Sequence, residues 1–487
     1  MRSYTLLVLT SLLAAASGAN LDVKLKTGTF RGASTTAGIE RWLGIPFALP
    51  PVGERRFRAP VPVTEASGAL RNATTFGNAC PQPPSNLGAP ISEDCLFLNL
   101  ASGLMDPKDL NAGLLDQREA LRFINANIRA FGGDPDKVTI WGQSAGAGSV
   151  QAHFIFPTSE SLFRAGIGES AVGPFKNSPE AREFDIPGLP FARLVNNVGC
   201  STDPDVLSCL REIPFDALLN ISNQMIDSTL NMQLWQPCVA AGSMVPERAS
   251  ARIERGDFLH LPYFAGTTVN EGTTFSTTLR NRGLSGALEN DAFAAFIRDL
   301  FINNSTITDD VVDRIITMWP ANDPSLGAPF NTGDSLFDRA EAWYGDEMFL
   351  APRRLFFQKG SPSQPMFAYR FAEFIPGNNP VLGVAHASDL PLLLGPAPTS
   401  VETTFSEQMI DAWVNFVNDL TPGGWSLSFS KHSDTLMFIL DGFPEYSNDN
   451  PLVVQLQRDN ITAIPDTWDL DMIEFLNTEE VLDEFEK

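Results

Sequence analysis

The feature that most constrains the fold of this chain is Gly-Gln-Ser-Ala-Gly at residues 142–146, a Gly-x-Ser-x-Gly pentapeptide. Residues 138–141 before it have the composition of a short buried strand, and residues 147–152 after it open a helix. A serine on such a sharp turn has an exposed hydroxyl and a strained backbone, and the flanking glycines avoid collisions. In this order of elements the motif predicts a nucleophilic Ser144, whereas the pentapeptide alone would fit an ordinary glycine-rich turn.

The first 19 residues have the composition of a secretory signal peptide. One Arg precedes an apolar run and small residues, and the stretch is too short to span a membrane. No later stretch is long and apolar enough for a transmembrane helix, so we expect a secreted, extracellular protein. Asn-x-Ser/Thr sites fit a glycosylated surface, and they lie at Asn72, Asn220, Asn303, Asn304 and Asn460.

The chain is strongly acidic, with a formal net charge of -24 over 487 residues. Such a field repels nucleic acid and anionic lipid surfaces, so no nucleic-acid partner is expected. A solubilising acidic coat is the simplest explanation, because the charge says little about an uncharged substrate. We find no internal repeat or long linker, which favours one α/β domain over residues 20–487. The sequence carries no signal for an oligomeric state.

Five cysteines lie in this exported chain. Cys80 and Cys95 enclose 14 residues, and Cys200 and Cys209 enclose eight. Both pairs are local, so we predict two disulfides and a buried thiol at Cys238. No cysteine or histidine cluster has metal-ligand spacing, so no metal is expected.

Strands and helices alternate along the rest of the chain. A helix with apolar residues between 114 and 131 stops at a Gly-Gly pair, and strands at 261–267 and 366–371 lead into polar loops. This alternation predicts a mostly parallel central sheet flanked by helices. In such sheets the chemistry gathers beyond the carboxyl ends of the strands.

A serine nucleophile needs a histidine base, and the chain has only four histidines. His153 lies on the same helix as Ser144, His260 precedes a strand at the wrong end of the sheet, and His432 lies in a polar surface turn. His386 lies in a loop that follows a strand and opens with glycine. We therefore predict that His386 is the base.

The histidine in turn needs a carboxylate, and here the residues leave alternatives. Glu271 lies just past the strand that ends near residue 268. Its place in the order serine, acid, histidine matches the α/β-hydrolase arrangement. Order and placement favour Glu271 slightly, with Asp389 as a rival and a solvated surface acid without a catalytic role as the remaining alternative.

Several separated blocks of the chain resemble the type B carboxylesterase/lipase family, which includes the cholinesterases and the fungal lipases. These blocks lie at residues 43–48, 50–57, 92–99, 111–118 and 131–135. The resemblance runs from about residue 28 to the C-terminus. It implies an α/β-hydrolase fold with no cofactor.

The resemblance also implies roles for individual residues. Ser144 would be the acyl-enzyme nucleophile, Glu271 the acid and His386 the base. The disulfides would be Cys80–Cys95 and Cys200–Cys209.

The chain departs from the family pattern at one point. After Leu100 the family would have a strand, a Gly-rich turn whose amides help to form the oxyanion hole, and another strand, whereas here Ala101 follows directly. We therefore expect an internal segment to be missing, and with it part of the sheet and the oxyanion loop. Only the amide of Ala145 can be assigned as an oxyanion donor. Each missing donor lowers the rate by roughly a hundred- to a thousandfold.

Two hypotheses follow. The first is a secreted serine hydrolase that cleaves small-molecule or lipid-like carboxylic esters through an acyl-enzyme intermediate. The loop between Cys80 and Cys95 is too short for the long lid of the family's fungal lipases, which favours soluble esters. The second is a catalytically impaired or non-catalytic binding protein, or a truncated isoform, because the Gly-rich segment is absent.

Overall fold

The computed structural model describes residues 21–64, 68–83, 88–95, 104–171, 178–423 and 442–486. The expected signal peptide, His432 and the junction between Leu100 and Ala101 lie outside these residues. No helix in the described ranges is long and apolar enough to cross a membrane.

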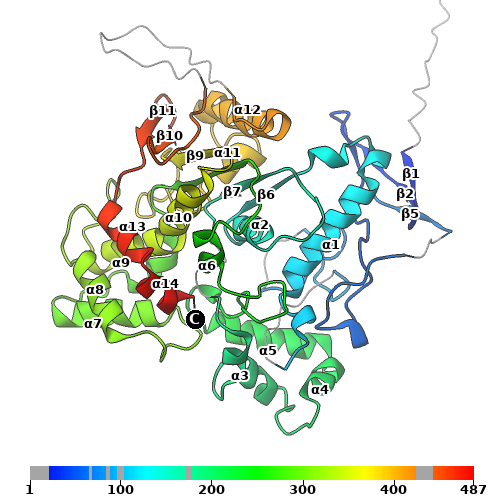
Figure 1. Ribbon diagram of the computed structural model, residues 1–487, viewed down its shortest axis with the longest axis horizontal. Helices are drawn as coiled ribbons and strands as arrows, with labels where there is room; N and C mark the ends of the chain where they lie inside the picture. Colours follow the sequence, from blue (N-terminus) through cyan, green and yellow to red (C-terminus); the bar gives the residue numbers. More distant parts are fainter. Residues whose placement is uncertain are drawn as a thin grey trace, which may run out of the picture.

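A six-stranded sheet forms the centre of the molecule, in the order β11-β10-β9-β8-β7-β6 (Figure 1). The pairs from β6 to β10 are parallel, and β11 alone runs antiparallel. The strands are β6 (Thr139–Gln143), β7 (Ala165–Glu169), β8 (Tyr263–Thr268), β9 (Met366–Phe371), β10 (Leu452–Leu456) and β11 (Thr462–Pro465). The sheet confirms the predicted fold class and the predicted strands, with boundaries shifted by a few residues.

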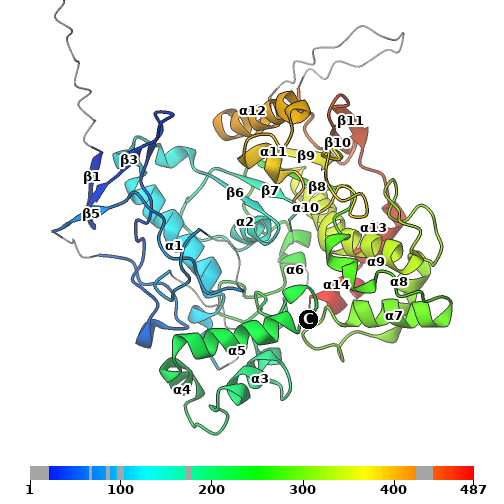
Figure 2. The same cartoon turned by 180° about the vertical axis from the view of Figure 1, so that it is seen from behind.

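The N-terminal segment forms two small sheets. One contains β1 (Asp22–Leu25), β2 (Gly28–Arg31) and β5 (Leu70–Asn72), and the other pairs β3 (Ala33–Ser34) with β4 (Glu40–Arg41). Figure 2 shows α1 (Ala112–Asn127) between the first of these sheets and the central sheet.

Helices cover both faces of the central sheet. Apolar residues of α1, α2 (Ala145–Ile155), α6 (Ala249–Glu254) and α10 (Ala351–Gly360) pack with one face. Those of α11 (Leu390–Leu394) and α12 (Thr403–Asp419) pack with the other. Strands buried on both faces are typical of parallel sheets, and every residue of β7 and β8 is buried.

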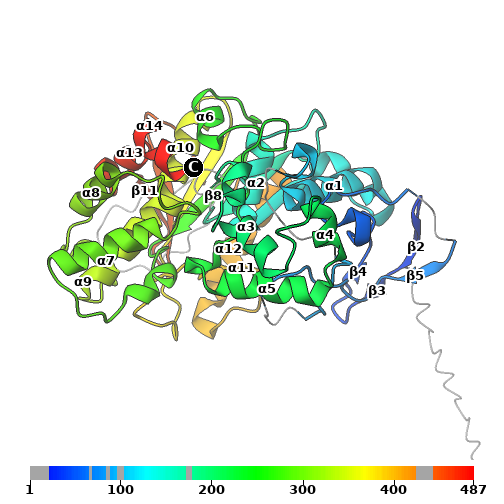
Figure 3. The ribbon, with the colours of Figure 1, turned by 90° about the horizontal axis from the view of Figure 1, so that it is seen from below.

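Two groups of helices surround this core (Figure 3). One has its own apolar cluster and contains α3 (Pro190–Asn197), α4 (Val206–Glu212) and α5 (Phe215–Asp227). The other contains α7 (Ala287–Arg298), α8 (Asp309–Met318), α9 (Ser335–Gly345), α13 (Leu470–Leu476) and α14 (Glu479–Phe485).

Strand β6, which leads to Ser144, is the last strand of the sheet in the part of the chain that the structure describes. None of its five residues is fully buried, and Trp141 is 43% exposed. Strands of parallel sheets are ordinarily covered on both faces. The exposed edge is what the expected loss of neighbouring strands would produce.

The cysteine prediction is half right. Cys200 and Cys209 form a disulfide, and Cys238 is a buried thiol whose pKa burial raises to about 12. The disulfide predicted between Cys80 and Cys95 is not formed. The Cys80 thiol instead lies 2.7 Å from the carbonyl oxygen of Cys95, so the two backbones are close but the sulfur is directed at the main chain.

Candidate active site

Ser144 occupies the turn between β6 and α2, as the sequence predicts. Its φ of 58° and ψ of −123° lie in a region that residues other than glycine rarely adopt, which is the strained conformation of a nucleophile elbow. A Cβ on Gly142 would overlap the carbonyl of Gly146, so glycine is required there. Gly146 itself faces open space among the described residues, so the predicted collision at that position is absent.

The amide of Ala145 is the expected oxyanion donor. Ala145 is the first residue of α2, and its amide therefore has no acceptor within the helix. The residue is exposed, so a substrate oxygen can reach it. The Gly-rich donors that the family would add have no counterpart in this sequence, and residues 96–103 lie outside the described part.

Glu271 lies three residues beyond the end of β8 and is only 4% exposed. Its Oε1 accepts hydrogen bonds from the amide of Thr268 and from the hydroxyl of Ser170, each at 2.6 Å. Its Oε2 lies 2.6 Å from Nδ1 of His386. Both oxygens of the carboxylate are therefore fixed, one by the fold and one by the imidazole.

His386 is brought to Glu271 by the pairing of their loops. The amide of Asn270 donates to the carbonyl of Val384 at 3.0 Å, and the Asn270 side-chain oxygen accepts from the Val384 amide at 3.2 Å. The rings of Phe275 and Phe349 pack against the imidazole, with centroids 5.2 and 4.7 Å away. The sequence predicted the histidine, but it gave no sign of the two rings.

The remaining histidines and the rival acid lie elsewhere. His153 is buried against Gln117, and burial lowers its pKa to about 4. His260 contacts Ser363 beyond the start of β8. Asp389 is fully buried and accepts from the Tyr369 hydroxyl at 3.3 Å, with no hydrogen bond to His386 among the described residues. The geometry therefore joins Glu271, and not Asp389, to the imidazole.

The structure does not show the serine and the histidine in direct contact within its described residues. Among the described residues, no hydrogen bond joins the Ser144 hydroxyl to His386. The side-chain amide nitrogen of Gln143 lies 3.1 Å from His386 Nε2 instead. Because Nδ1–H of the imidazole donates to Glu271, Nε2 is the acceptor, and the Gln143 amide donates to it. A serine proton would need that same lone pair.

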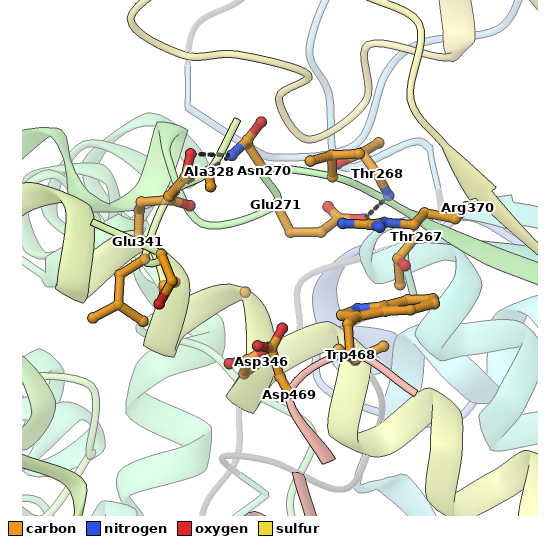
Figure 4. A pocket seen from close by; sticks show the side chains of 17 residues that line it. Thr267, Thr268, Asn270, Glu271, Ala328, Glu341, Asp346, Arg370, Trp468 and Asp469 are labelled. Carbon is orange, nitrogen blue, oxygen red and sulfur yellow. Dashed lines mark hydrogen bonds between the residues drawn. The ribbon is translucent and has the colours of Figure 1, made fainter. Parts of the chain in front are cut away.

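A polar cavity of about 80 Å³ borders Glu271 (Figure 4). It is lined by Asn270, Glu341, Asp346 and Arg370 among others, and neither Ser144 nor His386 lines it. Burial raises the pKa of Glu341 to about 8 and that of Asp346 well above its usual range. This polar, acidic space differs from a substrate pocket, which is mostly apolar.

Glu169 and Ser170, at the end of β7, were not predicted as site residues from the sequence. Glu169 is fully buried and accepts the indole N–H groups of Trp141 and Trp413 at 2.9 and 2.6 Å. The available signal was a polar pair directly after a buried strand, at the sheet end where the chemistry gathers.

Curated proteins of similar sequence are hydrolases of esters by name. The chain is 27% identical to secreted lipase 1 of Botryotinia fuckeliana over 85% of each chain. It is 25% identical to a secreted triacylglycerol lipase of Gibberella zeae, over 94% of this chain and 90% of the relative. It is 24% identical to para-nitrobenzyl esterase of Bacillus subtilis, over 88% of this chain and 96% of the relative.

These alignments span 514, 563 and 508 residues, more than the 487 of this chain, so each relative contains segments without a counterpart here. A model of the carboxylesterase family matches in two pieces, residues 19–110 and 106–467. Because the two pieces cover most of the sequence, this chain belongs to the carboxylesterase family, a family of carboxylic ester hydrolases with the α/β-hydrolase fold found here.

Proposed function

We propose that this protein is a secreted serine hydrolase that cleaves carboxylic esters through an acyl-enzyme intermediate. Ser144 attacks the ester carbonyl, and His386 takes the serine proton and returns it to the leaving alcohol. Water, deprotonated by the same imidazole, then releases the acid. Glu271 holds the imidazole in the tautomer with Nδ1 protonated and stabilises the imidazolium. The Ala145 amide donates to the developing oxyanion.

One observation carries this proposal. An imidazole fixed at 2.6 Å by a buried carboxylate stands at the same sheet end as a serine with the strained backbone of a nucleophile elbow. A surface glutamate or a structural histidine would not need both features. To reach the serine proton, the His386 lone pair must exchange the Gln143 amide for the Ser144 hydroxyl.

A fluorophosphonate probe tests the proposal directly, because it reacts covalently only with an activated serine. We expect a single modified residue, Ser144, found by peptide mass spectrometry, and no labelling of Ser144→Ala. A folded, full-length protein that stays unlabelled would contradict the proposal.

Export and glycosylation are parts of the same proposal. The N-terminal 19 residues support export, as do relatives that are themselves named secreted. Asn72, Asn220, Asn304 and Asn460 are exposed, which favours glycan attachment. The Asn303 amide nitrogen donates to Glu183 at 2.9 Å, which favours Asn304 of that adjacent pair.

The substrate class that we propose is a small, soluble ester. The short loop after Cys80 supports it, and one relative is named an esterase for a para-nitrobenzyl group. Hydrolysis of short and long p-nitrophenyl esters would separate the classes. A preference for emulsified long chains would contradict a soluble substrate.

A catalytically impaired or non-catalytic form is the second candidate. The exposed edge of β6, the open space at Gly146 and the two-piece family match support an internal segment missing between Leu100 and Ala101. Losing two oxyanion donors would lower the rate by about ten thousand- to a millionfold if the effects add. Sequencing of transcripts across this junction tests the idea. A longer reading frame whose product is no more active than this chain would contradict it.

A further inference from the structure

Glu169, the last residue of β7, contacts Ser144, and its neighbour in the chain, Ser170, contacts Glu271. Its backbone carbonyl accepts the Ser144 amide at 2.8 Å. The next residue, Ser170, holds the carboxylate of Glu271. The side chain of Glu169 is 0% exposed. Its Oε1 accepts the indole N–H groups of Trp141 on β6 and of Trp413 on α12. Glu169 therefore connects the serine strand to a helix packed on one face of the sheet.

In the described part of the chain, this carboxyl has no cation to compensate its charge. Among the described residues, no Lys, Arg or His forms an ion pair with Glu169, and its Oε2 has no hydrogen-bond partner. The elements β6 and α12 present only indoles to it. The titratable groups that face it belong to other elements: Asp389, Tyr369 on β9, and beyond them Glu271 and His386.

Burial and the nearby charge of Asp389 raise the pKa of Glu169 to about 8. Burial and Glu271 raise the pKa of Asp389 to about 6. If Glu169, Asp389 and Glu271 were all ionised, three negative charges would lie close together in the dry interior. Such a site retains a proton on one of its carboxyls instead. Glu169, which has the higher pKa, is the group that holds it.

We propose that Glu169 is a positioning residue that carries a proton, and that this neutral carboxyl clamps the serine-bearing strand β6 to helix α12 through its two indole hydrogen bonds. The inference rests on the proposed function of Ser144. The clamp matters because β6 pairs with β7 alone in the described structure. The two indole hydrogen bonds therefore support a strand that has no second neighbouring strand there. A carboxyl that must stay neutral also makes the clamp sensitive to alkaline pH.

Glu169→Gln is the decisive variant, because its carbonyl oxygen still accepts both indoles and its amide cannot ionise. A raised folded-state pKa stabilises the wild type fully below the unfolded value, about 4.5, and this contribution is lost as the pH rises through about 8. The unfolding constant of the wild type, relative to Glu169→Gln, should therefore rise by about tenfold per pH unit between roughly pH 5 and 8. Chemical denaturation over this range measures it. Parallel curves for the two proteins would overturn the proposal.

A second measurement follows the serine. Fluorophosphonate labelling of Glu169→Gln should match the wild type at pH 7 and persist above pH 8, where the wild type declines. Glu169→Leu, which keeps the bulk but loses the acceptor, should label about tenfold more slowly, because each lost hydrogen bond weakens the clamp. A Glu169→Leu variant that is labelled as fast as the wild type would contradict the clamp. So would a Glu169→Gln variant whose labelling rate falls above pH 8 as the wild-type rate does.

Asp116→Asn is the matched control. Asp116 is a buried carboxyl on α1 whose pKa burial raises to about 9, and it contacts none of the proposed catalytic residues. Its substitution should leave the labelling rate unchanged. The unfolding measurement needs no catalytic activity, so an unlabelled wild type would contradict the proposed function of Ser144 while the clamp is still decided by denaturation.

Discussion

The loops that carry Glu271 and His386 and the strand that carries Ser144 lie at the same end of one sheet, but they are supported very differently. Strand β8, before Glu271, is buried throughout and paired on both edges. Strand β6, before Ser144, has one described neighbour and an exposed tryptophan. Glu271 and His386, the proposed acid and base, are therefore held in contact with each other, whereas Ser144 depends on local backbone strain and on the contacts of β7. The weakly supported strand β6 is the one beside which the sequence predicts a missing segment.

The largest expected effect is the loss of activity when the proposed base, His386, is removed. His386→Ala removes the base, so ester hydrolysis and fluorophosphonate labelling should fall by about 10⁴- to 10⁶-fold. His153→Gln, a substitution at a buried histidine away from the serine, is the control and should change neither rate by more than a few-fold. Equal losses in both variants would mean that His386 acts only through stability.

The next prediction concerns Asp466, which follows β11 at the edge of the sheet opposite β6. Asp466 lies between Arg353 and Arg354 at 2.7 and 2.8 Å, and these charges lower its pKa to about 2. Asp466→Ala leaves two buried guanidinium groups uncompensated, which should lower the free energy of unfolding by about 3 to 5 kcal/mol. Urea denaturation measures it.

The depressed pKa of Asp466 also sets a pH window. Its stabilisation is present above about pH 3.8 and is lost as the pH falls through about 2, so the loss on substitution should be constant between pH 5 and 8. A loss that varies across that range would contradict the ion-pair explanation.

A smaller effect tests how Glu271 is held. Ser170→Ala removes the hydroxyl that donates to Oε1 of Glu271, and a hydrogen bond to a charged group is worth about 1.5 to 3 kcal/mol. We expect kcat to fall by about ten- to a hundredfold with little change in KM. Ser170→Gly, which also lacks the hydroxyl but suits the φ of 48° at this position, should lose as much of the rate. A glycine variant that keeps the wild-type rate would point to backbone strain in the alanine variant as the cause.

The smallest effect needs no substitution. Amide hydrogen exchange should be faster in residues 139–143 than in residues 263–268, by about tenfold or more, because a strand with a free edge opens more readily. Mass spectrometry of peptides from the two strands measures the ratio. Equal protection would mean that β6 is covered in solution.

The sequence predicted the main parts of the site because they are local signals. A glycine on each side of Ser144 marks the elbow, the small number of histidines isolates His386, and the rise and fall of hydrophobicity marks β8 and β9. The choice between Glu271 and Asp389 was left open by the residues themselves. Both follow strands or loops at the correct end, and only the direction of each side chain separates them.

Other features could not be predicted because they depend on the direction of side chains in the folded protein. Cys80 and Cys95 have spacing that fits a disulfide, yet the Cys80 sulfur is directed at a carbonyl oxygen. The amide of Gln143 takes the histidine lone pair, although its neighbour in the chain was the expected partner.

The sequence by itself determined the glycine-flanked turn at Ser144, the choice of His386 as the proposed base and the alternation of strands and helices, because glycine requirements, histidine scarcity and hydrophobic period act over short stretches of chain. Only the tertiary structure decided which carboxylate meets the imidazole, how Glu169 joins the serine strand to α12, and that β6 stands at the edge of the described sheet. These depend on the relative placement of residues 28 to 244 positions apart, and side-chain direction and burial exist only once the layers have packed.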